Sequence, residues 1–183
     1  MLLTNTLPET IFLSFSYFYL LRNIIDYTLL RLKILKKPII LKSAIISLLH
    51  SLVTGYHGIK YFYNYDLSLV NYNKEDIQVI HNLIVFSLGY FIQDFYYSLK
   101  NKSFTIADYI HHIWVIMFAF VVLDYPIRYK MVVFGCLTEI SSIFYNLAYI
   151  ISYFYGKNSN LYINNCAIFA VTFFLMRIVL FPF

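Results

Sequence analysis

Charged residues are scarce in this chain: Asp, Glu, Lys and Arg together make up 13% of its 183 residues. A soluble domain usually carries about a quarter charged residues, which it needs to cover a surface in contact with water. Apolar residues make up 61%, and the mean hydropathy is +0.68. This composition excludes an ordinary water-soluble domain and indicates that lipid surrounds most of the chain.

Cysteine is also scarce, and its two positions exclude two kinds of site. Cys136 and Cys166 both lie in apolar stretches, a pattern that forms neither a disulfide framework nor a zinc knuckle. We expect no metal site and no cofactor. The N-terminus lacks the basic region and small-residue cleavage site of a signal peptide, so we expect its first apolar stretch to be a retained membrane span.

The sequence does contain six mostly apolar windows, each near the roughly 17–25 residues that a membrane-spanning helix needs. The breaks between them are short and polar, none is long enough for a soluble domain, and no internal repeat is present. The pattern predicts an all-α fold, a polytopic transmembrane helical bundle with about six spanning helices. The predicted spans are residues 7–28, 39–60, 77–99, 106–124, 131–155 and 161–181.

The basic residues predict how the bundle is oriented. A cluster follows the first span, as in a cytoplasmic loop under the positive-inside rule, and it predicts an outside N-terminus and an affinity for anionic lipid headgroups. No basic groove motif is present, so we expect no nucleic-acid binding. The same topology places the glycosylation sequon at Asn101 in the cytosol, where it should stay unmodified. The cluster consists of Arg31, Lys33, Lys36, Lys37 and Lys42.

Ionisable side chains inside the spans are candidates for a functional site, because each costs several kcal/mol unless it is paired or hydrated. Asp94, His111 and His112 lie at similar depth on the third and fourth spans, where a helical hairpin can bring them together. Asp108 precedes the histidines by three and four residues, so its carboxylate can reach either ring. Such a histidine suits a general base or nucleophile.

A structural role is the open alternative, since polar side chains near helix ends also hold spans together through hydrogen bonds. A metal site is disfavoured because adjacent helical residues point about 100° apart. Glu139 and Arg177 are predicted to form an ion pair that clasps two spans. His50, on a face with Thr54 and His57, is predicted to be a buried packing residue.

Five short blocks, in order over residues 48–178, resemble the TLC domain family of multi-pass membrane proteins. The resemblance implies a TLC domain over residues 39–183, preceded by a first span and basic loop over 1–38. The blocks are Leu49-His50-Ser51-Leu52-Val53 with Gly55 and Gly58, Gly89-Tyr90-Phe91-Ile92-Gln93-Asp94, Ile110-His111-His112, Thr138-Glu139-Ile140-Ser141-Ser142 with Asn146, and Phe173-Phe174-Leu175-Met176-Arg177-Ile178.

Family members differ in function. Resemblance to the ceramide synthases, which join a long-chain base to an acyl-CoA, implies a catalytic role for His111 and His112 with Asp94. Those enzymes carry a Thr three positions after the histidines and a later Asp-bearing block, whereas this chain has Trp114 and the block at Glu139. It therefore resembles the plain TLC-domain proteins more closely. These continue with a further hydrophobic span, which is expected to be missing here.

Three functions follow as hypotheses. The first is lipid binding, lipid sensing or membrane lipid homeostasis in the endoplasmic reticulum or another internal membrane, with membrane lipids as partners. The second is an acyl-CoA-dependent N-acyltransferase that uses His111 and His112 on an acyl-CoA and a sphingoid base. The third is a trafficking receptor of internal membranes, for which the sequence contains no sorting signal.

Overall fold

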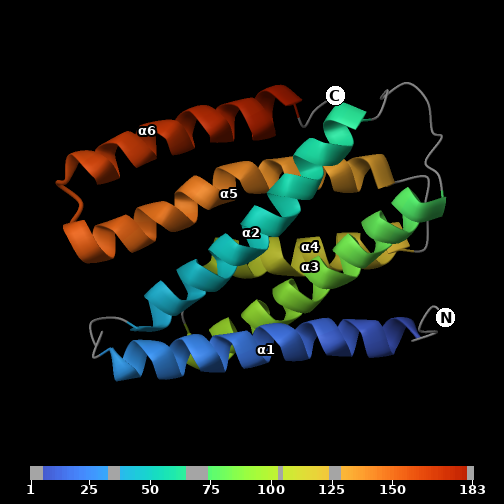
Figure 1. The fold of residues 1–183 in the computed structure, drawn as a ribbon, viewed down its shortest axis with the longest axis horizontal. Helices are drawn as coiled ribbons and strands as arrows, with labels where there is room; N and C mark the ends of the chain where they lie inside the picture. Colours follow the sequence, from blue (N-terminus) through green and yellow to red (C-terminus); the bar gives the residue numbers. More distant parts are fainter. Residues whose placement is uncertain (1–5, 33–37, 65–73, 103–104, 124–128, 181–183) are drawn as a thin grey trace. The chain divides into compact units, whose positions relative to one another are not determined.

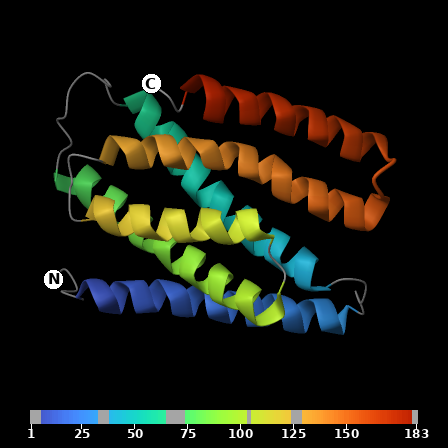
Figure 2. The same ribbon diagram turned by 180° about the vertical axis from the view of Figure 1, so that it is seen from behind.

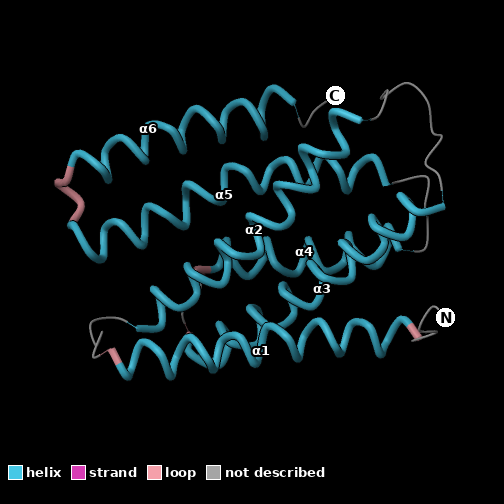
Figure 3. Tube along the Cα trace, in the orientation of Figure 1, coloured by secondary structure: helices cyan, strands magenta, loops and turns pink. Residues whose placement is uncertain are grey.

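The structure is a computed structural model that describes residues 6–32, 38–64, 74–102, 105–123 and 129–180. Its described segments are almost entirely helical (Figures 1 and 3). Lys33, Lys36 and Lys37 of the basic cluster and Ser103 of the sequon lie outside the described residues. The helices are α1 (Leu7–Arg31), α2 (Pro38–Asn64), α3 (Lys74–Asn101), α4 (Ile106–Leu123), α5 (Tyr129–Tyr155), α6 (Asn160–Phe174) and the π-helix η2 (Leu175–Leu180), which continues α6.

Each predicted span corresponds to a helix, and the predicted helical membrane bundle is confirmed. Among the described residues, four helices are long and apolar enough to cross a membrane: Ile39–Tyr63, Ile106–Leu123, Lys130–Tyr155 and Asn160–Leu180. Large apolar side chains on α4, such as Trp114 at 70% and Met117 at 58%, are exposed. Such exposure fits a helix whose surrounding solvent is lipid. The chain is therefore an integral membrane protein.

Two compact units alternate along the chain. One comprises Met1–Ile34 and Tyr72–Tyr129, and the other comprises Leu35–Asn71 and Lys130–Phe183. The first unit therefore contains α1, α3 and α4, and the second contains α2, α5, α6 and η2. The predicted division of the chain at residue 38 follows the family resemblance rather than compactness, and it stays a prediction.

In the first unit α1 and α3 run in the same direction, as both ribbon views show (Figures 1 and 2). The Ser14 hydroxyl donates to the Phe86 carbonyl, and the Phe18 ring packs against Tyr90. Both pairs are separated by 72 residues in the sequence, which is the constant offset expected of parallel helices. The contacts recur every four residues, so they follow one stripe on each helix.

The α3–α4 pair is antiparallel, as a hairpin requires. The Tyr109 hydroxyl donates to the Ser98 carbonyl, and the Phe95 ring packs edge-on against Tyr109. One turn earlier on α3, Phe91 packs against His112, one turn later on α4. This register brings the buried polar residues of α3 next to the start of α4.

In the second unit α2 and α5 approach each other closely at a glycine. A Cβ added at Gly58 would lie 2.8 Å from the Leu137 backbone nitrogen. Small residues permit such backbone approach between membrane helices. α5 and α6 form an antiparallel hairpin through the turn after Tyr155 (Figures 1 and 2), and the Asn165 side chain of α6 donates to the Phe144 carbonyl of α5.

Candidate functional site

The polar centre of the first unit is an ion pair between α1 and α3. Arg22 Nη2 donates to Asp94 Oδ1, and Arg22 Nε donates to Gln93 Oε1 at 3.2 Å. Arg22 and Asp94 are only 2% and 4% exposed. The guanidinium carbon also lies 3.9 Å from the centre of the Tyr97 ring, within the range of a cation–π contact. Burial of either charge therefore depends on the other.

His112 of α4 joins this pair from the other side. Its Nε2 lies 3.2 Å from Asp94 Oδ2, and its Nδ1 lies 3.0 Å from the Asp108 carbonyl oxygen. The ring is buried, and Phe91 packs edge-on against it. The predicted meeting of Asp94 with α4 across the hairpin is thus observed for His112. We call Arg22, Asp94 and His112 the charge cluster.

Hydrogen-bond chemistry limits the protonation of His112. A carbonyl oxygen only accepts, so the contact with Asp108 requires a proton on Nδ1. The contact between Nε2 and Asp94 needs a second proton, carried either by Nε2 or by the carboxyl group. In both cases the two ring nitrogens are engaged, and no nitrogen lone pair is directed at a substrate while Asp94 stays in place.

His111 is the other histidine of the predicted catalytic pair. It lies on an exposed face of α4, and its ring packs edge-on against Phe91 and His112. The two histidines diverge because adjacent helical residues point about 100° apart. The structure therefore separates the predicted catalytic pair into one buried and one exposed ring.

The expectation that the Asp108 carboxylate would reach a histidine ring is wrong. Asp108 Oδ2 instead accepts from the backbone nitrogen of Thr105 at 2.9 Å and from its hydroxyl at 2.8 Å. The Thr105 hydroxyl in turn accepts from the Asp108 backbone nitrogen. This reciprocal arrangement caps the start of α4, where the first backbone N–H groups have no partner in the helix. Only the Asp108 carbonyl contacts His112.

Sequence reasoning missed Arg22, although a signal was present. An arginine inside an apolar span needs a partner, and the predicted first and third spans run in the same direction. Counted from the predicted ends at residues 28 and 99, Arg22 lies six residues deep and Asp94 five. At 1.5 Å per residue these depths are nearly equal, so Asp94 was the natural partner.

In the second unit the predicted ion pair between Glu139 and Arg177 does not form. Glu139 Oε2 accepts from the Ser51 hydroxyl of α2 at 2.9 Å. Arg177 instead donates through Nε to Ser141 and through Nη2 to Ser142, each at 3.4 Å. Glu139 is held against α2, whereas Arg177 lies beside a later part of α5. Each charge therefore has hydroxyl partners in place of the other.

Of the remaining polar residues of this unit, Asn146 joins two helices, whereas His50 and His57 make contacts within α2. Asn146 Nδ2 donates to the Ser47 hydroxyl at 2.9 Å, which links α5 to α2. His50 is buried, at 1% exposure, and its carbonyl accepts from the Thr54 hydroxyl one turn later. The His57 ring stacks on Tyr61. Hydrogen bonds between helices, such as that from Asn146 to Ser47, hold membrane helices together.

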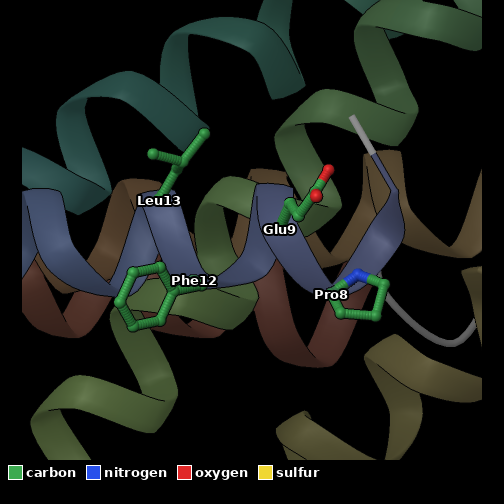
Figure 4. Close-up of a pocket in the computed structure, with 4 residues that line it drawn as sticks. All are labelled: Pro8, Glu9, Phe12 and Leu13. Carbon is green, nitrogen blue, oxygen red and sulfur yellow. The ribbon is translucent and has the colours of Figure 1, made fainter. Parts of the chain in front are cut away.

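Within the described ranges, no three His, Cys, Asp or Glu side chains gather closely enough to hold a metal ion. A shallow surface hollow lies on the first turns of α1, lined by Pro8, Glu9, Phe12 and Leu13 (Figure 4). All four residues come from one helix, and the Glu9 carboxylate already accepts from the Thr6 backbone nitrogen that it caps. A second hollow lies between α1 and α3 around Tyr17 and Val85. Neither hollow includes a candidate catalytic residue.

Comparison with known proteins identifies one family. The family model described as the TLC domain matches residues 41–183, which is most of the chain and includes every candidate site residue except Arg22. No curated protein and no solved structure matches the chain.

Proposed function

The chain belongs to the TLC domain family, and we propose that it binds or senses membrane lipids without using its paired histidines as an acyltransferase. Its partners are then the lipids of the bilayer that surrounds it. The proposed location is an internal membrane such as the endoplasmic reticulum, and the proposed role is in membrane lipid homeostasis.

The observation that carries this proposal is the engagement of both ring nitrogens of His112. An acyl-imidazole or general-base mechanism needs a nitrogen lone pair that can reach the substrate. Asp94 and the Asp108 carbonyl occupy the two nitrogens, and Arg22 holds the other oxygen of Asp94. The charge cluster therefore connects α1, α3 and α4 to one another, as a structural contact between helices does.

The block at Glu139 supports the same view. Its polar members connect α5 to its neighbours: Glu139 bonds Ser51, Asn146 bonds Ser47, and the two serines bond Arg177. These are interhelical hydrogen bonds of the kind that stabilise membrane bundles. At this position the ceramide synthases carry an Asp-bearing block, which this chain lacks.

The alternative, an N-acyltransferase acting on an acyl-CoA and a sphingoid base, has one observation in its favour. The His111 ring lies on an exposed face of α4, where a lipid acyl chain can approach it. An enzyme of this kind would therefore depend on His111 as nucleophile or base, with His112 as its buried support.

A purified-protein assay tests the proposal. The detergent-solubilised chain is incubated with palmitoyl-CoA and sphinganine, released CoA is measured, and the lipids that copurify with it are extracted and identified. We expect copurified membrane lipid and no CoA release above the rate without protein. His111→Ala and His81→Ala serve as variant and control; within the described residues His81 Nδ1 has no hydrogen-bond partner. CoA release that His111→Ala abolishes and His81→Ala preserves would establish the acyltransferase instead.

A further inference from the structure

Arg177 occupies an unusual place in the second unit. It lies in the π-helix η2, which continues the apolar helix α6. π-Helical turns are rare and occur frequently at functional sites. The guanidinium carbon lies 5.3 Å from the centre of the Phe173 ring, so one planar face of the group has an aromatic neighbour and its N–H edges point elsewhere.

Hydrogen bonds within the described part of the chain use only some of the donor capacity of Arg177. A guanidinium has five N–H donors and no acceptor. Two of these donors make long bonds of 3.4 Å to the uncharged hydroxyls of Ser141 and Ser142. Across the described residues Arg177 forms no ion pair, and the Glu139 carboxylate accepts from the Ser51 hydroxyl instead.

The neighbouring hydroxyl adds a further donor. Ser141 donates its own proton to the Thr138 carbonyl at 2.7 Å. Ser142 accepts from Arg177, yet in the described part of the chain its hydroxyl proton has no acceptor. Arg177 and Ser142 thus present several donors and one positive charge to the same region, and no carboxylate of the described residues pairs with them.

A group that complements this arrangement is an anion with several acceptor oxygens. The planar guanidinium matches the geometry of a phosphate, which it binds through two parallel hydrogen bonds. The depth of Arg177 in the membrane also suits a headgroup phosphate. Arg177 lies 17 residues after the start of α6 at Asn160, which is about 25 Å at 1.5 Å per residue, against a hydrocarbon core of about 30 Å. An arginine at this depth can reach the headgroup region opposite the α5–α6 turn.

We propose that Arg177 and Ser142 form a binding site for the phosphate group of a membrane phospholipid. The proposal rests on the lipid-binding function proposed above and names the headgroup chemistry that it recognises. Neighbouring α6 side chains such as Val171, at 59% exposed, and Phe174, at 53%, offer apolar surface for the acyl chains of the same lipid.

Native mass spectrometry of the protein in a maltoside detergent tests the site. The probes are dioctanoyl phosphatidic acid, dioctanoylglycerol, which lacks the phosphate, and inorganic phosphate. We expect phosphatidic acid to bind and dioctanoylglycerol to bind at least tenfold more weakly. Arg177→Gln should weaken phosphatidic acid binding about tenfold or more, and Ser142→Ala about threefold. Lys157→Gln, which removes an exposed charge from the α5–α6 turn, should leave binding unchanged.

The outcomes distinguish lipid phosphate from free phosphate, and failure of the Arg177 site from failure of the lipid-binding function. Arg177-dependent binding of inorganic phosphate as strong as that of phosphatidic acid would support the anion site and identify free phosphate as its ligand. Equal binding of phosphatidic acid by wild type and Arg177→Gln, or equal binding of dioctanoylglycerol and phosphatidic acid, would overturn the site. Phosphatidic acid binding that is independent of Arg177 would nevertheless leave the lipid-binding function standing.

A milder substitution serves if Arg177→Gln disturbs folding. If Arg177→Gln does not yield a monodisperse protein, Arg177→Lys keeps the charge and removes the planar fork. Weaker phosphatidic acid binding by both Arg177→Lys and Ser142→Ala would support the site. Unchanged binding by both would refute it.

Discussion

At the scale of single residues, this protein buries two opposite charges together. Arg22 and Asp94 are almost completely removed from solvent, in helices that pack within an apolar bundle. Taking either ion out of water costs several kcal/mol, and only the partner and its hydrogen bonds offset that cost. Removing one partner should therefore be far more damaging than removing both.

A double-mutant cycle measures this dependence. Arg22→Met and Asp94→Leu should each lower the free energy of unfolding by about 3–5 kcal/mol, because each leaves an uncompensated buried charge. The double variant should lose much less than the sum of the two single losses. Unfolding in mixed micelles with increasing denaturing detergent provides the measurement. Strictly additive losses would show that the two charges are not coupled.

The sequence predicted only part of this site. The Asp94–His112 contact follows from hairpin geometry, since residues at equal depth on antiparallel neighbours meet. The expected contact of the Asp108 carboxylate with a histidine ring does not form, because the free N–H groups at the start of α4 compete for that carboxylate. The predicted Glu139–Arg177 ion pair does not form, because similar depth in the membrane does not place Glu139 on the face of α5 that meets Arg177. Each charged group bonds a nearby hydroxyl instead.

At the scale of helices, two glycines determine how closely the pairs approach. A Cβ at Gly89 would collide with the Ser14 side chain and lie 2.7 Å from the Phe15 backbone nitrogen, and a Cβ at Gly58 would lie 2.9 Å from the Cys136 carbonyl carbon. In both cases the neighbouring atoms include backbone, which cannot move aside without moving a helix. These glycines therefore set the α1–α3 and α2–α5 spacing.

Gly58→Ala tests this account, with Gly135→Ala as a matched control. The first substitution forces α2 and α5 apart and should lower the free energy of unfolding by about 1–3 kcal/mol. A Cβ at Gly135 meets nothing within 4 Å, so the second should be neutral, or stabilising by up to about 1 kcal/mol through helix propensity. Thermal unfolding in detergent compares them. Equal effects of the two substitutions would contradict the close approach.

The helices themselves were largely predictable, because a helix that crosses the membrane needs a long run of mostly apolar residues, which is visible in the sequence. All six predicted windows match helices, and the observed ends differ mainly by extending into the polar breaks. The π-helical end of α6 was not predictable. Leu175 to Leu180 have ordinary helical composition, and the widened turn leaves no compositional signal.

For the whole molecule, family membership and composition agree that the chain is a multi-pass membrane protein. They do not identify its chemistry, because one fold supports several functions. The choice between lipid binding and acyl transfer depends on the two histidines. His112 is buried in the charge cluster, whereas the His111 ring lies on an exposed face of α4 and packs against His112. We proposed lipid binding over acyl transfer because of this difference.

Whole-cell lipid analysis tests that claim most directly. Cells express wild type or the His111→Ala/His112→Asn double variant, with an empty vector as reference and membrane levels matched by blotting. Asparagine at position 112 retains a side-chain donor but cannot form an acyl-imidazole. We predict that the two proteins give the same lipid profile, with no ceramide raised above the reference. A ceramide or other acylated lipid that rises with wild type and not with the variant would contradict the account.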